Sequence, residues 1–211
     1  MPTTASNGAL EVFVVDDDPA VRDALATVLT IEGFHVTGFA DGGAFITAAR
    51  SRTPACILLD VHMPGRSGLD ILKELNAQNY ASPIFIISGQ GDIPMAVEAI
   101  KNGALDFIEK PFDADTVVSR VRDAIDASAR RNQNGRADFL HMAFPGHDLL
   151  TPREREVLAQ IASGASNKEA GRHLGISPRT IEVHRARIME KLGAKNAADL
   201  VRIVLTEGRG Q

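Results

Sequence analysis

The sequence predicts an α/β domain with a doubly wound, five-stranded parallel sheet, followed by a small all-α domain of four helices that contains a helix-turn-helix. Three observations support this prediction. Short apolar runs alternate with helical patterns up to about residue 128, whereas only helical patterns follow residue 148. The length of 211 residues suits two small domains. The charge also divides, because residues 1–147 carry a net charge of −7 and residues 148–211 carry +3.

The predicted strands are five short runs rich in β-branched and apolar residues. The clearest are residues 10–15, 56–59 and 84–87, and weaker ones are residues 34–37 and 106–109. Continuous apolar runs of this length are typical of parallel strands buried on both faces of a sheet. Strands that alternate with helices predict the doubly wound arrangement.

Helical patterns lie between these runs. Residues 21–31 place their apolar side chains on one face, with Asp18 as a candidate cap at the start and Gly33 at the end. Residues 69–75 and 95–100 show similar patterns.

Polar side chains occupy the carboxyl ends of the predicted strands, where ligands bind in such sheets. They are Asp16 and Asp17 after the first strand, Asp60 after the third, Ser88 after the fourth and Lys110 after the fifth. Crowded carboxylates repel one another, so a cation is expected among them, and oxygen ligands favour Mg²⁺. Lys110 and Ser88 can hold phosphoryl oxygens. The arrangement suits the formation and retention of an aspartyl phosphate.

With these residues in place, residues 10–128 resemble the CheY-like receiver domain of two-component response regulators. The resemblance rests on the residues Asp16-Asp17, 60–65, Ser88-Gly89, Phe107 and Lys110-Pro111. It implies that Asp60 accepts a phosphoryl group from a sensor histidine kinase. It also implies that Asp17, Asp60 and the backbone carbonyl of His62 bind Mg²⁺ directly, and that Asp16 acts through a bound water.

The same resemblance implies a switch. Lys110 and Ser88 bind the phosphoryl oxygens, and Phe107 moves inward as Ser88 moves toward the phosphate. The switch is expected to reshape the face around residues 95–100 and the fifth strand. A homodimer is expected to form on phosphorylation and to bind two DNA half-sites. The protein is expected to act as a phosphoryl acceptor and not as an enzyme, with at most slow autodephosphorylation.

The second domain begins with a strong helix start. Thr151 is a candidate cap, Pro152 suits the first helical position, and Glu154 supplies the acid of a capping box. A short helix over residues 167–174 and a turn at Gly175 come next. A longer helix over residues 178–192 then completes a helix-turn-helix, and a fourth helix covers residues 196–205.

The longer helix has two different faces when it is drawn at 3.6 residues per turn. The expected core side carries Ile181, Ile188 and Leu192. The opposite side, which suits the major groove, carries Arg179, Glu182, Val183 and Ala186, flanked by Arg185, Arg187 and Lys191. The periodicity alone also allows an ordinary solvated helix face.

Residues 148–208 resemble the LuxR/NarL-type DNA-binding domain, and the whole chain resembles the FixJ branch of response regulators. The resemblance rests on the segments 150–154, 167–169, 174–177, 180–184 and 191–192. One departure is Gly171, where alanine is usual, and it is expected to weaken the second helix slightly.

This resemblance implies that the third helix binds double-stranded promoter DNA and that the fourth supports dimerisation. The residues expected to face bases are Glu182, Val183 and Ala186. The residues expected to contact phosphates are Lys168, Arg179, Thr180, Arg185 and Lys191.

The expected organisation is a disordered tail over residues 1–9, a receiver domain over 10–128, a linker over 129–147 and the DNA-binding domain over 148–208. The last receiver helix, residues 113–132, is expected to extend into the linker.

The chain is expected to be cytoplasmic, without a membrane partner. Its single cysteine, Cys56, lies in a predicted buried strand, and a lone thiol suits a reducing compartment. No apolar stretch is long enough to span a bilayer, and the first residues lack the features of a secretory signal.

Two other functions are weighed against this one. A phosphohydrolase also uses an aspartyl phosphate, but it needs a second acid two residues after the nucleophile, where this chain has His62. A constitutive DNA-binding protein would use its first domain only for protein contacts, and the complete acidic site argues against it. A nucleotide-binding enzyme is not indicated, because no Gly-x-Gly-x-x-Gly follows the first strand.

Overall fold

The structure of the protein, a computed structural model, describes residues 9–89, 93–133, 144 and 146–207. The chain divides into two compact units, Met1–Val121 and Arg122–Gln211. Most of the expected N-terminal tail and the middle of the expected linker lie outside the described residues.

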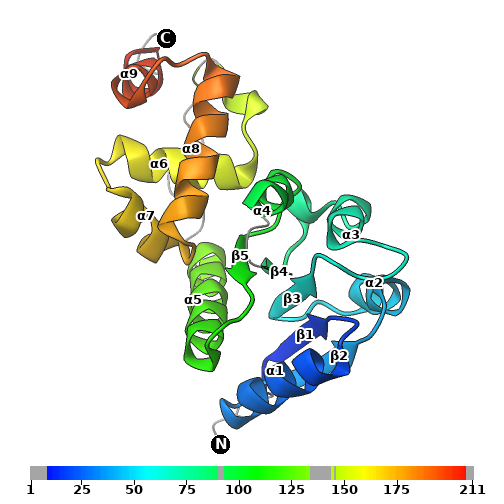
Figure 1. Ribbon diagram of the computed structural model, residues 1–211. Helices are drawn as coiled ribbons and strands as arrows, with labels where there is room; N and C mark the ends of the chain where they lie inside the picture. Colours follow the sequence, from blue (N-terminus) through cyan, green and yellow to red (C-terminus); the bar gives the residue numbers. More distant parts are fainter. Residues whose placement is uncertain (1–8, 90–92, 134–143, 145, 208–211) are drawn as a thin grey trace, which may run out of the picture. The chain divides into compact units, whose positions relative to one another are not determined.

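Five parallel strands form the sheet of the first unit, in the order β2-β1-β3-β4-β5 (Figure 1). Their bounds are Glu11–Val15 (β1), His35–Phe39 (β2), Cys56–Asp60 (β3), Ile84–Ser88 (β4) and Asp106–Glu109 (β5). Every residue of β3 and β4 is buried, as the continuous apolar runs predict. The edge strand β2 is only partly buried, and its sequence pattern is correspondingly weaker.

Helices cover both faces of this sheet, with α1 and the part of α5 up to Val121 on one face and α2, α3 and α4 on the other (Figure 1). Their bounds are Pro19–Ile31 (α1), Gly42–Ser51 (α2), Gly68–Glu74 (α3), Ile93–Lys101 (α4) and Ala114–Gln133 (α5), and a short 3₁₀ turn, η1, covers Ala77–Asn79. The doubly wound fold is therefore confirmed.

The helix ends follow local chemistry. The Asp18 carboxylate accepts a hydrogen bond from the backbone N–H of Ala20 at 2.8 Å, which confirms the predicted cap of α1. Helix α2 was not among the predicted elements. Its cap is Asp41, whose carboxylate accepts from two backbone N–H groups of the first turn.

The second unit contains a helix-turn-helix, as predicted. Its helices are Pro152–Ala162 (α6), Asn167–Leu174 (α7), Pro178–Leu192 (α8) and Ala197–Glu207 (α9), and a short 3₁₀ turn, η3, covers His147–Leu149. Gly175 joins α7 to α8 with a φ of +67°, a left-handed conformation that favours glycine. Apolar side chains of all four helices are buried, among them Val157, Leu174, Ile181 and Val204.

In the described part of the chain, no helix is both long enough and apolar enough to cross a membrane.

Candidate functional site

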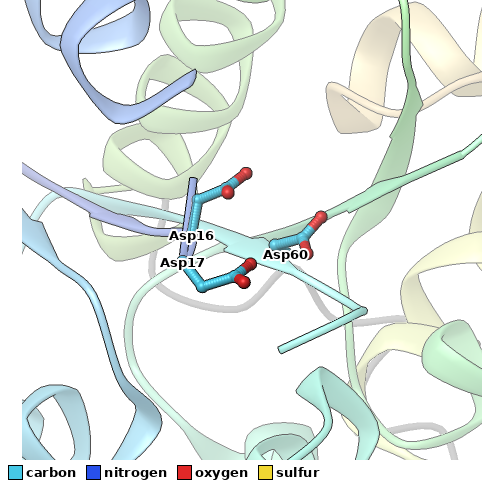
Figure 2. Close-up of side chains that lie close together, drawn as sticks. All are labelled: Asp16, Asp17 and Asp60. Atoms are coloured by element: carbon cyan, nitrogen blue, oxygen red, sulfur yellow. The ribbon is translucent and has the colours of Figure 1, made fainter. Parts of the chain in front are cut away.

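Three carboxylates converge at the carboxyl ends of two neighbouring strands. Asp16 and Asp17 follow β1, Asp60 ends β3, and these strands pair directly. Figure 2 shows the three side chains close together, and each contributes an oxygen within 4.8 Å of the others. The sheet order reverses direction at β1 and β3, so the cluster occupies the switch point where doubly wound sheets bind ligands.

The three acids differ in exposure. Asp16 is fully buried and Asp60 is only 4% exposed, whereas Asp17 is exposed. Local hydrogen bonds fix the buried pair, because the backbone N–H of Asp18 donates to Asp16 at 2.9 Å and that of His62 donates to Asp60 at 3.1 Å. Two buried acids and one exposed acid form a site that is rigid at its base and open to solvent on one side.

The ammonium of Lys110 lies between the two buried acids. Its Nζ is 2.8 Å from Oδ2 of Asp16 and 2.9 Å from Oδ1 of Asp60. Burial raises the pKa of Asp60; Lys110 opposes this shift and the charge of Asp16 adds to it. Burial would lower the pKa of Lys110, but its contacts with the two carboxylates outweigh this effect and raise it.

One ammonium does not balance three carboxylates, so the cluster is suited to a further cation. The donors are all oxygens, which fit a hard ion such as Mg²⁺ better than a softer transition metal. Asp17 adds an accessible ligand to the two buried ones.

The remaining predicted residues of this site lie on the neighbouring strands. Ser88 ends β4 and is 1% exposed, and Phe107 lies in β5 with 8% exposure. The carbonyl of Ser88 accepts from the backbone N–H of Lys110 at 2.7 Å, which joins the ends of β4 and β5. Arg120 of α5 donates to the carbonyl of Phe107 at 2.6 Å and pairs with the buried Asp106.

Gly68 brings the start of α3 close to the end of β3. Its backbone N–H donates to the carbonyl of Val61 at 2.9 Å. A Cβ at this position would lie 2.5 Å from the carbonyl oxygen of Asp60. This close approach was not anticipated from the sequence.

In the second unit, α8 has the two faces that its periodicity predicts. The buried side carries Ile181, His184 and Ile188, with Leu192 half-buried. The opposite side is exposed at Arg179, Glu182 and Ala186 and half-buried at Val183.

The predicted phosphate contacts fall into two groups. Lys168 and Arg179 are exposed, and Arg185 is half-buried beside Asn167. Thr180, in contrast, is fully buried, and its hydroxyl lies 3.0 Å from that of Ser177. We therefore leave Thr180 out of the DNA contacts proposed below.

Lys191 forms an ion pair with Glu154 within the second unit. Its Nζ lies 2.7 Å from Oε2 of Glu154, and Arg187 lies 3.5 Å from the other oxygen. Glu154 is fully buried and also caps α6 through Thr151. Burial would raise the pKa of Glu154, but hydrogen bonds and the two cations outweigh this effect and lower it.

His184 is the other buried ionisable group of this unit. It is 3% exposed, and neither ring nitrogen has a hydrogen-bond partner among the described residues. Burial, together with the charges of Arg153, Arg187 and Lys191, lowers its pKa to about 3, against the opposing effect of Glu154. Its position in the helix pattern predicts burial. Arg187 and Lys191 lie on the same helix, whereas Arg153 and Glu154 belong to α6, and the pattern of α8 alone does not predict these two neighbours.

The features of the two units define a regulator that joins a CheY-like α/β domain to a helix-turn-helix domain. Residues 12–122 match the family described as response regulator receiver domain, and residues 148–204 match bacterial regulatory proteins, luxR family.

Relatives match over nearly the whole chain. The transcriptional regulatory protein FixJ of Azorhizobium caulinodans is 43% identical over 202 residues, which cover 95% of this chain and 94% of that protein. FixJ of Bradyrhizobium diazoefficiens is 41% identical over 199 residues, covering 93% and 95%. The crystal structure of full-length FixJ from B. japonicum has a TM-score of 0.57 and 40% identity, and the match covers 96% of this chain and 98% of that one.

The chain therefore belongs to the FixJ-like response regulators, with a receiver domain and a LuxR-type DNA-binding domain. This organisation implies a histidine kinase partner and DNA binding, and it is consistent with phosphorylation-dependent regulation of transcription. Members of this family are generally not enzymes.

Proposed function

We propose that Asp60 accepts a phosphoryl group from a sensor histidine kinase and that this modification controls dimerisation and DNA binding. The observation that carries the proposal is the convergence of Asp16, Asp17 and Asp60, with the ammonium of Lys110 in contact with Asp16 and Asp60. A carboxylate at the centre of such a cluster is positioned both to attack phosphorus and to be stabilised afterwards.

In the proposed reaction, a carboxylate oxygen of Asp60 attacks the phosphorus of a phosphohistidine. A new P–O bond forms, and the P–N bond breaks with its electron pair going to the imidazole. The ammonium of Lys110, which contacts Oδ1 of Asp60 before the reaction, would then donate a hydrogen bond to a phosphoryl oxygen. The hydroxyl of Ser88 would donate a second hydrogen bond to the phosphoryl group.

Mg²⁺ would be held by Asp17, Asp60 and the backbone carbonyl of His62, with Asp16 acting through a water. When bound, it would neutralise charge on the phosphoryl oxygens. Asp16 would meanwhile keep Lys110 close to the site, since its carboxylate contacts the same ammonium. The protein would then serve as a phosphoryl acceptor, without turnover of a separate substrate.

Phosphorylation would act on the rest of the receiver through Ser88 and Phe107. A movement of Ser88 toward the phosphoryl group would let Phe107 shift within β5, beside the face formed by α4. We propose that this face forms a homodimer on phosphorylation. Phosphorylation shifts the equilibrium between the resting and the dimerising conformation only as far as it stabilises one of them more than the other.

We propose that the protein acts in the cytoplasm. There, α8 of the second unit would enter the major groove of promoter DNA. We propose that Glu182, Val183 and Ala186 face bases and that Lys168, Arg179 and Arg185 contact phosphates. Their exposure supports these roles. The ammonium of Lys191 donates one hydrogen bond to Glu154, so Lys191 would contact phosphate only through its other N–H groups.

The experiment that tests the phosphorylation site is intact-mass measurement after incubation with Mg²⁺ and acetyl phosphate. Wild type is expected to gain one phosphoryl group, and Asp60→Asn none. Asp113→Asn serves as the matched control, because this acid is exposed, accepts from the backbone N–H of Thr116 at the start of α5, and is not one of the three clustered acids. A phosphoryl group retained by Asp60→Asn would contradict the proposal.

A further inference from the structure

We propose that Asn167 is a positioning residue for DNA recognition, whose amide orients the Glu182 carboxylate and the Arg185 guanidinium before DNA binds. Asn167 lies outside the recognition helix, at the start of α7. The inference rests on the proposed DNA-binding function and deepens it, because it names a residue that determines sequence discrimination without itself reading a base.

The geometry behind this proposal is a bridge made by one side chain. Nδ2 of Asn167 donates to Oε1 of Glu182 at 3.2 Å. Nη1 of Arg185 donates to Oδ1 of the same amide at 2.8 Å. Glu182 and Arg185 lie about one turn apart in α8, so the bridge spans the edge of the face that carries the predicted DNA contacts.

An amide suits this bridge because it carries both a donor and an acceptor. The donor meets a carboxylate and the acceptor meets a guanidinium, so both bonds are charge-assisted. A carboxylate at position 167 would keep the acceptor for Arg185 but repel Glu182.

Positioning matters because Glu182 and Arg185 have long side chains with many rotamers. Ordering each such side chain on binding costs about a 2- to 10-fold loss of affinity. The bridge restricts both side chains in the free protein. Oε2 of Glu182 keeps its capacity to accept a hydrogen bond from cytosine N4, and other N–H groups of Arg185 can reach a phosphate.

The test uses phosphorylated full-length protein and a pool of duplexes with 20 randomised base pairs. Selection with wild type yields a consensus duplex, and affinities are then measured for this duplex and its single-base-pair variants. The variants are Asn167→Ala, Asn167→Asp, Glu182→Ala and the double variant Asn167→Ala/Glu182→Ala. Lys168→Ala is the matched control, because Lys168 is the exposed neighbour on the same helix and a predicted phosphate contact.

A positioning role predicts a loss confined to one base pair. Asn167→Ala is expected to lower discrimination about 5- to 20-fold at the base pair where Glu182→Ala also loses it. The double variant is expected to lose no more discrimination there than Glu182→Ala alone. Asn167→Asp is expected to show the same local loss, and it should fold, because an acidic residue in the first turn favours a helix.

The control separates positioning from direct phosphate contact. Lys168→Ala is expected to weaken binding to all duplexes equally and to reduce the salt slope by about 1. If Asn167→Ala and Asn167→Asp keep the wild-type base profile, or weaken all duplexes equally as Lys168→Ala does, the inference is overturned. Failure of wild type to enrich any sequence would instead contradict DNA recognition itself, and the inference with it.

Discussion

The buried His184 makes the stability of the second unit depend on pH in a calculable way. Burial among Arg153, Arg187 and Lys191 lowers its pKa from 6.5 to about 3, although Glu154 opposes the shift. The folded state therefore keeps this imidazole neutral while the unfolded chain takes up a proton below pH 6.5. Stability is expected to fall as the pH drops from 6.5 toward 3.

The magnitude follows from the two pKa values. Between pH 7 and pH 5 the unfolded state gains a proton that the folded state does not bind, which costs about 2 kcal/mol of unfolding free energy. Glu154 contributes little in this window. Its pKa is lowered in the folded state, so the stability that it provides is lost only below its ordinary value of 4.5.

The assay is urea unfolding of the full-length protein at pH 7 and pH 5, followed through the NMR methyl signals of Ile181 and Ile188. These two side chains are buried on the same face of α8 as His184. Wild type is compared with His184→Gln, which cannot titrate. Wild type is expected to lose about 2 kcal/mol more than the variant on acidification. Equal losses in the two proteins would refute the account of His184.

Three further substitutions test other parts of the structure. Lys110→Ala leaves two buried carboxylates without their ammonium, so we expect slower phosphorylation by acetyl phosphate, measured by intact mass; an unchanged rate would contradict the role of Lys110. Glu154→Ala removes the carboxylate that accepts from the Thr151 backbone N–H and from the Lys191 ammonium. We expect it to lower the unfolding free energy in urea by about 3 kcal/mol, and a loss below about 1 kcal/mol would contradict this role. Gly68→Ala places a Cβ 2.5 Å from the carbonyl oxygen of Asp60, so we expect both the melting temperature and the phosphorylation rate to fall. If both stay unchanged, the end of β3 can shift without cost and this expectation is wrong.

The sequence predicts the acidic cluster because parallel strands place their carboxyl ends at one edge of a sheet. Once β1 and β3 are identified from their apolar runs, Asp17 and Asp60 must lie close together. The orientation of α8 is predictable for a similar reason, since its period separates Ile181 from Glu182. In both cases the relevant geometry is local to a strand or a helix.

Other features depend on packing between distant segments and were not predicted. The ion pair of Lys191 joins residues 37 positions apart, and it turns a predicted phosphate contact toward the protein interior. Thr180, which the sequence analysis expects to contact phosphate, is fully buried. Helix α2 was missed because it begins with Gly42 and Gly43, which have low helix propensity.

The central claim is that phosphorylation of Asp60 controls DNA binding, and the most direct measurement is DNA affinity with and without acetyl phosphate. The probe is the duplex selected by wild type from the randomised pool, and Asp60→Asn is measured beside it. Wild type is expected to bind about 5- to 150-fold more tightly after phosphorylation, whereas Asp60→Asn does not change. Equal affinity of the two proteins under both conditions would contradict the account and favour constitutive DNA binding.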